Sequence, residues 1–352
     1  MVARPGPEAP CRHAACGRNS GGVVVTSTKD IEWAARILRR GGLIAFPTET
    51  VYGLGAHALL PEAVRAIFKA KGRPSDNPLI VHIGRREDVS RIARDVPESA
   101  LRLMNAFWPG PLSIVLPRRW DVPDVVTGGR DTVAIRMPDH PVALRLLQVA
   151  DVPVAAPSAN RSGAPSPTTS QAVLEDLGDR IDGVLEGGVP RVGLESTVVD
   201  CTGIQPVVLR HGGIPLEELR LVEPDIRVAT TAELGAGRSP GARHVHYRPR
   251  ARVWIVTPGD AAQGGMPPGS AWIGQSEPAD RGYGLTPWAK IEVVPDVETY
   301  ARRIFAFFRE CDREGIAHIH CENVQPGGLG EALMDRLRRA AGDDSIPGYT
   351  GP

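Results

Sequence analysis

The sequence predicts an α/β fold with two domains, because segments with strand character alternate with segments of helical period. Apolar runs such as residues 79–83 and 112–116 have the length of buried strands. Between such runs lie amphipathic segments such as residues 62–71, where apolar side chains recur at helical spacing and Gly72 follows as a C-cap. With 352 residues, the chain is long enough for two domains that each bury a core.

In the first domain, over residues 23–222, we expect a twisted mixed sheet with flanking helices. The expected strands are residues 23–25, 43–46, 79–83, 112–116, 132–137, 152–156, 183–185, 196–200 and 207–209. The expected helices are residues 30–38, 62–71, 98–108, 141–149 and 171–177. Residues 46–55 are interpreted as the end of a strand followed by a glycine-rich loop.

A segment without clear periodicity, residues 223–250, separates this domain from the next. It carries a serine, arginines, two histidines and a tyrosine within residues 238–247. We therefore expect it to fold back over a site as a lid, with a solvated tether as the alternative.

The second domain is expected over residues 251–344 as a smaller α/β unit. Its predicted strands are residues 252–257, 271–273, 290–294 and 316–321, and its predicted helices are residues 300–314 and 331–341. Residues 1–22 are expected to form a disordered tail and residues 345–352 a second tail.

Charge and composition argue against several classes of protein. The chain has 41 basic and 41 acidic residues, which disfavours a surface coated with positive charge but leaves room for a local basic cleft. No apolar run approaches the roughly 18 residues that a membrane span requires. The five cysteines show no regular framework, so we expect a reducing, cytoplasmic location.

Two groups of cysteine and histidine could be drawn as metal sites. They are Cys11, His13 and Cys16 near the N-terminus, and His318, His320 and Cys321 in a strand-like run. The first group lacks a nearby fourth ligand, and strand alternation alone explains the second. We predict no metal site of the protein's own.

The most informative segment is residues 71–79, where a helix ends and a proline-containing loop leads into a buried strand. Lys71 and Arg73 flank Gly72 there, and Asn77 follows in the loop. Fixed positive charge at the end of a sheet suits an anion with several oxygens, such as a nucleotide phosphate or bicarbonate.

Other polar segments also follow expected strands. Residues 46–55, 156–163, 195–200 and 209–213 supply hydroxyls, amides and a further cation. Arg136 lies on an otherwise apolar strand, so it should meet a carboxylate, with an acid of the protein itself as the alternative to a ligand. Residues 53–58 formally match a dinucleotide fingerprint, but residues 47–52 separate them from their strand, so we reject that reading.

No Ser-His-Asp or Cys-His arrangement stands out in the sequence. The chemistry is therefore expected to depend on charge and positioning rather than on a covalent intermediate.

Taken together, these segments resemble the threonylcarbamoyl-AMP synthases of the YrdC-like superfamily. The resemblance is carried, in the family's order, by residues 46–55, 71–79, 132–138, 157–163, 195–200 and 209–213. Residues 239–247 and the second domain, with its segments 328–332 and 334–337, resemble the longer two-domain form. The implied fold is a YrdC-like catalytic domain with a smaller, Rossmann-like domain after it.

The resemblance implies synthesis of L-threonylcarbamoyladenylate from L-threonine, bicarbonate and ATP, with release of pyrophosphate. The product would pass to a downstream tRNA threonylcarbamoyl transferase complex for modification of tRNA at position 37. L-threonine would be surrounded by Thr50, His82, Arg136, Ala156 and Ser196. ATP would bind to Lys71, Arg73, Asn77, Thr132, Ser158, Ser166, Arg210 and Tyr247. Lys71 and Arg73 would act electrostatically in catalysis, and Mg²⁺ would come with the phosphates.

Three other classes remain as alternatives. A carbamoyltransferase of the same superfamily would carry acylphosphatase-like and zinc-finger segments that we do not find in this sequence. A double-stranded RNA binder would use a basic cleft, which the neutral net charge disfavours, and a synthase could also make a weak contact with RNA. A regulatory ATP sensor would explain nucleotide binding but not a pocket for threonine.

Overall fold

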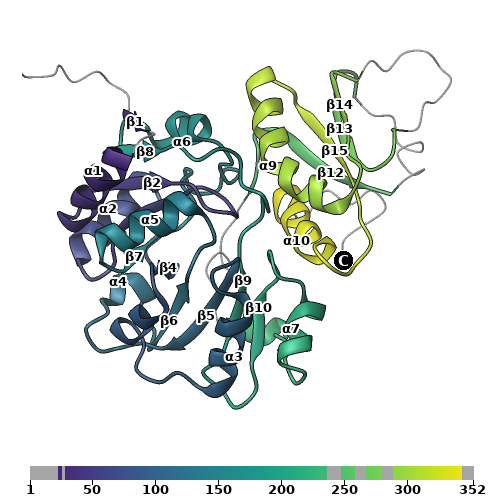
Figure 1. The fold of residues 1–352 in the computed structure, drawn as a ribbon. Helices are drawn as coiled ribbons and strands as arrows, with labels where there is room; N and C mark the ends of the chain where they lie inside the picture. Colours follow the sequence, from purple (N-terminus) through teal and green to yellow (C-terminus); the bar gives the residue numbers. More distant parts are fainter. Residues whose placement is uncertain (1–22, 26–27, 236–246, 258–266, 279–287, 343–352) are drawn as a thin grey trace, which may run out of the picture.

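The computed structural model describes residues 23–25, 28–235, 247–257, 267–278 and 288–342. The expectations for the two tails, for the Cys11, His13 and Cys16 group and for most of residues 238–247 fall outside the described residues. Figure 1 shows two α/β bodies, the larger one containing the N-terminal half of the chain.

The first domain is built on a mixed sheet that has eleven strands within the described residues, in the order β1-β8-β2-β3-β7-β4-β6-β5-β9-β10-β11. The strands are β1 (Val23–Val25), β2 (Ile44–Phe46), β3 (Gly53–His57), β4 (Ile80–His82), β5 (Leu112–Pro117), β6 (Thr132–Arg136), β7 (Val154–Ala155), β8 (Gly183–Leu185), β9 (Thr197–Asp200), β10 (Val207–Arg210) and β11 (Arg227–Val228). Strands β4 and β6 pair parallel, whereas β3 and β7 pair antiparallel. The predicted mixed sheet is confirmed.

Helices cover this sheet. They are α1 (Thr28–Arg39), α2 (Pro61–Lys71), α3 (Glu98–Phe107), α4 (Asp124–Thr127), α5 (Pro141–Ala150), α6 (Ser170–Leu177), α7 (Leu216–Val222) and α8 (Thr231–Gly235), with a 3₁₀ helix at Arg86–Arg91. Side chains alternate along β2, so Ile44 and Phe46 pack with α1 and α5. Ala45 points to the opposite face and joins a core with α2, α3 and α6. The alternation thus builds one apolar core on each face of the sheet.

The short helices α4, α7 and α8 and the 3₁₀ helix were not expected from the sequence, and the sheet differs from the expectation in two segments. The glycine-rich loop does not extend to Gly55, because β3 begins at Gly53 and pairs with both β2 and β7. A Cβ atom on Gly55 would lie 2.8 Å from both Phe46 and Val154, so this glycine serves close packing of strands rather than phosphate binding. The sheet also continues past residue 222, because β11 pairs parallel with β10.

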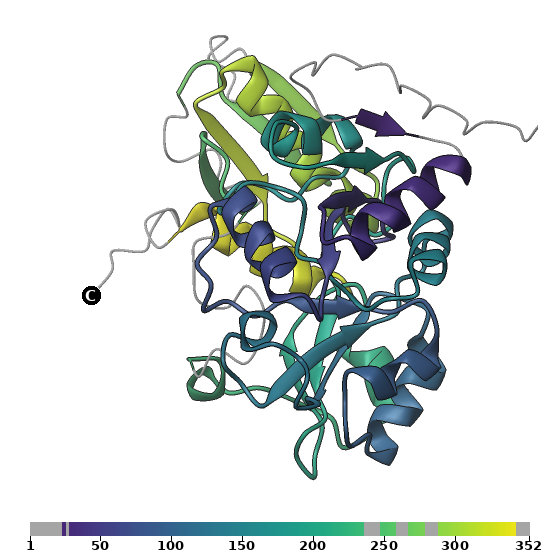
Figure 2. The ribbon, with the colours of Figure 1, turned by 90° about the vertical axis from the view of Figure 1, so that its left-hand side faces the viewer.

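The second domain has a parallel sheet, four-stranded within the described residues, in the order β12-β15-β13-β14. Its elements are β12 (Arg252–Val256), β13 (Ala271–Gly274), β14 (Lys290–Val293), α9 (Val297–Glu314), β15 (His318–Glu322) and α10 (Gly330–Ala341). In Figures 1 and 2, α9 and α10 lie on the side of this sheet that faces the first domain. A smaller C-terminal α/β domain is therefore confirmed.

The two domains meet through α9 and α10. Arg309 of α9 donates from Nη2 to the Pro165 carbonyl at 2.6 Å and lies 2.7 Å from Asp176 Oδ2. Gly193, at φ +79°, lies so close to α9 that a Cβ atom would come within 2.3 Å of the Arg302 Cα. This close contact requires glycine and brings the loop before β9 against the second domain.

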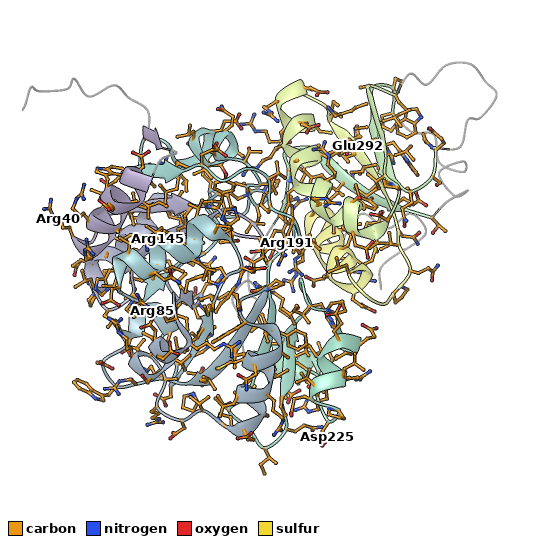
Figure 3. The ribbon with its side chains drawn as sticks, in the orientation of Figure 1. Arg40, Arg85, Arg145, Arg191, Asp225 and Glu292 are labelled. Carbon is orange, nitrogen blue, oxygen red and sulfur yellow. The ribbon has the colours of Figure 1, made fainter. Side chains whose placement is uncertain are left out.

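Charged side chains of both signs are found on the ribbon in Figure 3, where Arg40, Arg85 and Arg145 are labelled on the first domain and Glu292 on the second. None of the described helices is both long and apolar enough to cross a bilayer.

His318, His320 and Cys321 do not form a metal site. Cys321 is buried beneath α9, whereas His320 stacks against Trp254 on the other face of the sheet. Among the described residues, no group of three or more histidine, cysteine, aspartate or glutamate side chains is arranged to hold a metal ion.

Candidate active site

A cavity lies where the ends of several strands of the first domain meet the segment that precedes the second domain. It is lined by Thr48, Thr50, Val51, Gly53, Arg73, Pro78, Leu79, Ile80, His82, Arg136, Ala156, Pro157, Ser158, Glu195, Ser196, Arg210 and Tyr247. The lining combines three arginines with small hydroxyl-bearing side chains. Such a lining suits anions that carry several oxygens.

Sheet pairing explains why residues far apart in sequence meet here. His82 at the end of β4 is in register with Arg136 at the end of β6, because the two strands are parallel. His82 is also opposite Val154 of β7, which leads directly to Ala156 and Ser158. Period-two alternation predicts that Arg136 shares a face with Thr132 and Ala134, but only strand order places it beside His82.

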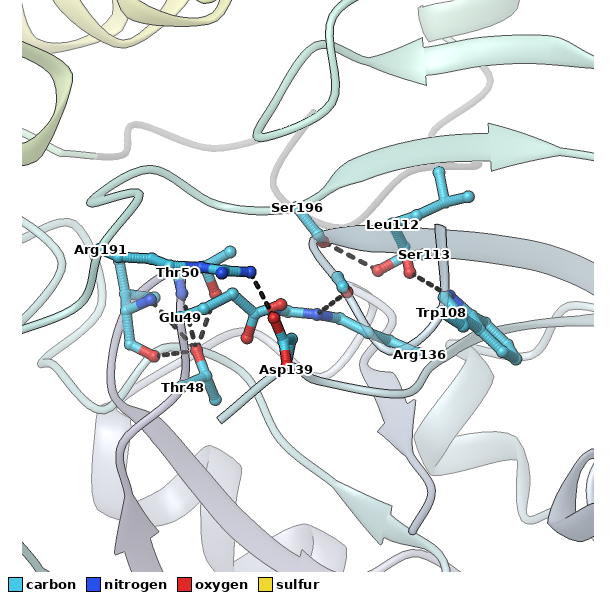
Figure 4. Close-up of polar contacts among 12 residues, drawn as sticks. Thr48, Glu49, Thr50, Trp108, Leu112, Ser113, Arg136, Asp139, Arg191 and Ser196 are labelled. Atoms are coloured by element: carbon cyan, nitrogen blue, oxygen red, sulfur yellow. Dashed lines mark hydrogen bonds and ion pairs between the residues drawn. The ribbon is translucent and has the colours of Figure 1, made fainter. Parts of the chain in front are cut away.

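Arg136 is buried and meets a carboxylate of the protein. Its Nη2 lies 2.8 Å from Oε1 of Glu49, and the side chains are 5% and 1% exposed. The ion pair has poor hydrogen-bond geometry, since neither Glu49 carboxylate oxygen nor Arg136 Nη2 makes a hydrogen bond. Arg136 Nε donates to the Gly110 carbonyl at 3.3 Å. Figure 4 shows this pair beside Thr48 and Thr50.

Hydroxyl groups are ordered by short contacts around this pair. Thr48 Oγ1 donates to the Val51 carbonyl at 2.6 Å and lies 2.8 Å from Thr50 Oγ1. Ser196 Oγ lies 2.8 Å from Ser113 Oγ on β5, as Figure 4 also shows. The turn after β2 and the start of β9 thus present fixed hydroxyls to the cavity.

His82 is neutral at physiological pH. Burial, followed by the positive charge of Arg136, lowers the pKa of His82 to about 3. The ring can therefore accept or donate a hydrogen bond in the cavity, but it adds no charge there.

Arg73 and Arg210 provide positive charge on the other side of the cavity. Arg73 Nη2 donates to the Pro78 carbonyl at 3.3 Å. Burial lowers the pKa of Arg73 to about 10, so the guanidinium remains charged at neutral pH. Arg210, at the end of β10, donates from Nη2 to the Ser196 carbonyl at 2.8 Å. Both guanidinium groups donate hydrogen bonds to neutral backbone carbonyls.

Tyr247 closes the cavity from the segment before the second domain. It is buried with φ +67°, a left-handed conformation that is rare for tyrosine. Its ring stacks on Phe305 of α9 with 5.3 Å between the ring centroids. The neighbouring Arg248 N–H donates to the Gly163 carbonyl at 2.8 Å, which ties this segment to the first domain.

The sequence-predicted residues fall into two groups. Those that line the cavity are Thr50, Arg73, His82, Arg136, Ala156, Ser158, Ser196, Arg210 and Tyr247. Those that lie outside its lining are Lys71, Asn77, Thr132 and Ser166.

Lys71 has a well-defined place behind the cavity wall. Its Nζ donates to the carbonyls of Ser158 and Asn160 at 2.6 and 2.5 Å. Burial, followed by the charge of Arg73, lowers the pKa of Lys71 well below its usual value. In this structure Lys71 stabilises, through these hydrogen bonds, the loop that places Ser158 at the cavity.

Two acidic side chains at the site were not among the sequence-predicted residues. Glu195 lines the cavity, and Glu49 pairs with Arg136. The segments that contain them were singled out, but an exposed carboxylate and a buried one look alike in a sequence. The burial of Arg136 on an apolar strand was the signal that an acid had to lie nearby.

Comparison with known proteins identifies this arrangement. Residues 36–212 match a family model described as telomere recombination, and residues 214–342 match one described as threonylcarbamoyl-AMP synthase, C-terminal domain. The chain belongs to the two-domain threonylcarbamoyl-AMP synthase family. The boundary between the two matches falls near α7, before the segment that carries Tyr247.

Relatives in this family match along most of their length. A threonylcarbamoyl-AMP synthase of Pyrococcus abyssi is 45% identical over 322 residues, which cover 88% of this chain and 95% of the relative. A threonylcarbamoyl-AMP synthase of Bacillus subtilis is 41% identical, with 90% of this chain and 94% of the relative covered. A crystal structure of P. abyssi Sua5 complexed with L-threonine superimposes with a TM-score of 0.83 at 42% identity and covers 92% of this chain and 99% of that one.

Proposed function

We propose that this protein is a nucleotidyltransferase that makes L-threonylcarbamoyladenylate from L-threonine, bicarbonate and ATP and releases pyrophosphate. The observation that carries the proposal is that all five residues expected around L-threonine line one cavity together with four of those expected around ATP. The chain also resembles, over most of its length, a protein whose crystal structure is complexed with L-threonine.

We assign the Arg136 end of the cavity to L-threonine. The substrate carboxylate would pair with Arg136, whose Nη2 makes no hydrogen bond in the protein. The hydroxyls of Thr50 and Ser196 are held at fixed positions beside it. A site built from such groups rejects analogues that lack the matching polar atoms, because its own groups would then stay unsatisfied.

We assign the opposite end to the phosphates of ATP. Arg73 and Arg210 supply the charge, Ser158 supplies a hydroxyl, and Tyr247 covers the site. Mg²⁺ would arrive on the phosphates and neutralise part of their charge when bound. The chain offers it few ligands, because Glu195, the carboxylate in the cavity lining, is already bonded to Ser166 and Arg336.

The chemistry that follows needs no nucleophilic side chain. The threonine nitrogen attacks the carbon of CO₂ and loses a proton, or attacks the carbon of bicarbonate with loss of a water molecule, and either route gives a carbamate. A carbamate oxygen then attacks the α-phosphorus of ATP, and the bond to the β,γ-diphosphate breaks as pyrophosphate leaves. Both partners are anionic, so fixed arginines promote the reaction by reducing repulsion and by holding the two groups in line.

Release of pyrophosphate from ATP, bicarbonate and L-threonine tests the proposal. We expect release only when all three substrates are present, with L-serine as the near-matched control amino acid. Threonine-independent release would favour a different ATP-dependent activity and overturn the synthase proposal. Binding of ATP without any turnover would favour the regulatory sensor.

The cellular context follows from the proposed product. An acyl-adenylate mixed anhydride is unstable in water, so a tRNA threonylcarbamoyl transferase complex should consume it in the same compartment. We place the protein in the cytoplasm on this basis. A weak contact with RNA would serve this transfer, and tRNA added to the assay should then leave pyrophosphate release intact.

A further inference from the structure

A side chain of the second domain reaches the back wall of the proposed active site. Arg336 of α10 is fully buried, and its Nε donates to Oε2 of Glu195 at 2.9 Å. Its Nη1 donates to the His211 carbonyl at 2.9 Å and to Asp335 Oδ2 at 2.8 Å. The second domain is therefore joined by charge and hydrogen bonds to two strand ends that border the cavity.

Glu195 is the carboxylate through which this contact reaches the cavity. Its other oxygen, Oε1, accepts a hydrogen bond from Ser166 Oγ at 2.6 Å. Burial alone would raise the pKa of Glu195, but Arg336 and then Arg210 hold it below its usual value. Glu195 is thus ionised and fully engaged, with Arg336 as its bonded cation and Arg210 as a second positive neighbour.

Arg210 is the cation with which Glu195 could form an ion pair if Arg336 were absent. Its guanidinium donates to the carbonyl and hydroxyl oxygens of Ser196, the residue next to Glu195. It also lines the cavity where we place the phosphates of ATP. Arg210 is the other positive charge that lowers the pKa of Glu195. Without Arg336, an ionised Glu195 would attract Arg210, and pairing would draw Arg210 away from the cavity.

The same arginine also orders Tyr247. The Arg336 guanidinium carbon lies 5.5 Å from the centroid of the Tyr247 ring, while Phe305 stacks against that ring. Both contacts come from the second domain. The left-handed backbone of Tyr247 is strained for a tyrosine, so it needs such packing to persist.

We propose that Arg336 is a positioning residue for ATP, which engages Glu195 and Tyr247 so that Arg210 stays available to the phosphates. The role of the second domain is then to complete the nucleotide site rather than to bind a separate ligand. This inference rests on the proposed function, because it assigns Arg210 to ATP.

The key experiment compares Arg336→Met with the double variant Glu195→Gln/Arg336→Met. In the single variant, Glu195 is left charged beside Arg210, so we expect the KM for ATP to rise roughly tenfold or more, the effect of losing a hydrogen bond to a charged group. The KM for L-threonine should change much less. In the double variant, residue 195 is no longer charged, so the KM for ATP should return most of the way to the wild-type value.

Controls separate positioning from a general loss of structure. Arg338→Met removes an exposed arginine from the same helix and should leave both KM values unchanged. Arg336→Lys keeps the charge and should have an intermediate KM for ATP. Circular dichroism and thermal unfolding will show whether each variant is folded, and if Arg336→Met is not, the double and lysine variants decide the question.

The outcomes are distinct. An unchanged KM for ATP in folded Arg336→Met, or equal rises in both KM values with no recovery in the double variant, would overturn the positioning role. If the wild-type protein itself shows no threonine-dependent pyrophosphate release, the proposed function fails instead.

Discussion

Two buried arginine–glutamate pairs lie at the same cavity, and they differ in how well their polar atoms are satisfied. In the Arg136–Glu49 pair, the two charged groups lie 2.8 Å apart, yet neither Glu49 oxygen makes a hydrogen bond. In the Arg336–Glu195 pair, both carboxylate oxygens of Glu195 accept hydrogen bonds, one from Ser166 and one from Arg336, although Arg336 Nη2 makes none.

The difference indicates two kinds of function for the same pair of residue types. A buried charge pair with few hydrogen bonds contributes little net stability, because desolvation offsets its attraction. Such a pair can exchange one carboxylate for another when a substrate enters. A pair whose carboxylate oxygens both accept hydrogen bonds is more costly to break, so it fixes the geometry of its surroundings.

The largest expected effect on activity comes from replacing the arginine of the Arg136–Glu49 pair. Arg136→Met removes the proposed partner of the threonine carboxylate, so kcat/KM for L-threonine should fall at least about a hundredfold, as truncation of buried charge pairs does elsewhere. Pyrophosphate release at varied L-threonine measures it, and Arg145→Met, in the exposed part of α5, is the control. A fall below tenfold would assign the carboxylate to another residue.

A second prediction compares the two glutamates by their contribution to stability. Glu195→Gln removes the charge that Arg336 Nε and Ser166 bond, while Asp335 stays beside Arg336. The free energy of unfolding should therefore fall by about 2 kcal/mol, the cost of losing a hydrogen bond between charged groups. Glu49→Gln breaks no hydrogen bond of its own and should cost much less. Urea unfolding of both variants at pH 7 measures the difference, and equal losses would remove the distinction between the pairs.

A third prediction concerns His82, whose low pKa arises from burial and then from Arg136. Its pKa is about 3 in the folded protein and 6.5 as the reference value. Below pH 6.5 the unfolded chain binds a proton that the folded chain does not, so stability falls with falling pH, by up to about 1.4 kcal/mol per pH unit. Unfolding of wild type and His82→Gln at pH 7 and pH 5 should show a shallower loss for the variant.

The smallest effect is expected when a hydrogen-bond partner of the Arg336–Glu195 pair, rather than the pair itself, is removed. Ser166→Ala removes one hydrogen bond to Glu195, so the free energy of unfolding should fall by about 1 kcal/mol. Arg336 remains bonded to Glu195, so the KM for ATP should rise only slightly. A rise as large as that of Arg336→Met would mean that Ser166 contacts ATP directly.

Much of the fold could be predicted from the sequence because local periodicity is strong in this chain. The valine-rich runs became strands, and Glu62 to Lys71 became a helix that ends at Gly72 in the left-handed conformation. Strand β3 was missed because its glycines read as a loop. Only close packing against Phe46 and Val154 explains why a strand accepts Gly55.

The sequence predicted which charged residues lie at the candidate site, but it did not predict which residues contact one another there. The polar segments at strand ends contained most of the residues that line the cavity, including Arg73 before a strand and Arg136 and Arg210 at the ends of strands. The buried position of Lys71 under Ser158 and Asn160 was not predictable, because hydrogen bonds to distant carbonyls leave no local pattern.

By itself, the sequence determined the two-domain α/β organisation and the family, because periodicity and short motifs are local properties of the chain. The tertiary structure alone decided which carboxylate meets which arginine. Strand order brings Glu49 to Arg136, and the packing of α10 brings Arg336 to Glu195, across separations of 87 and 141 residues along the chain. Electrostatic partners are chosen by distance in space, which the order of residues does not encode locally.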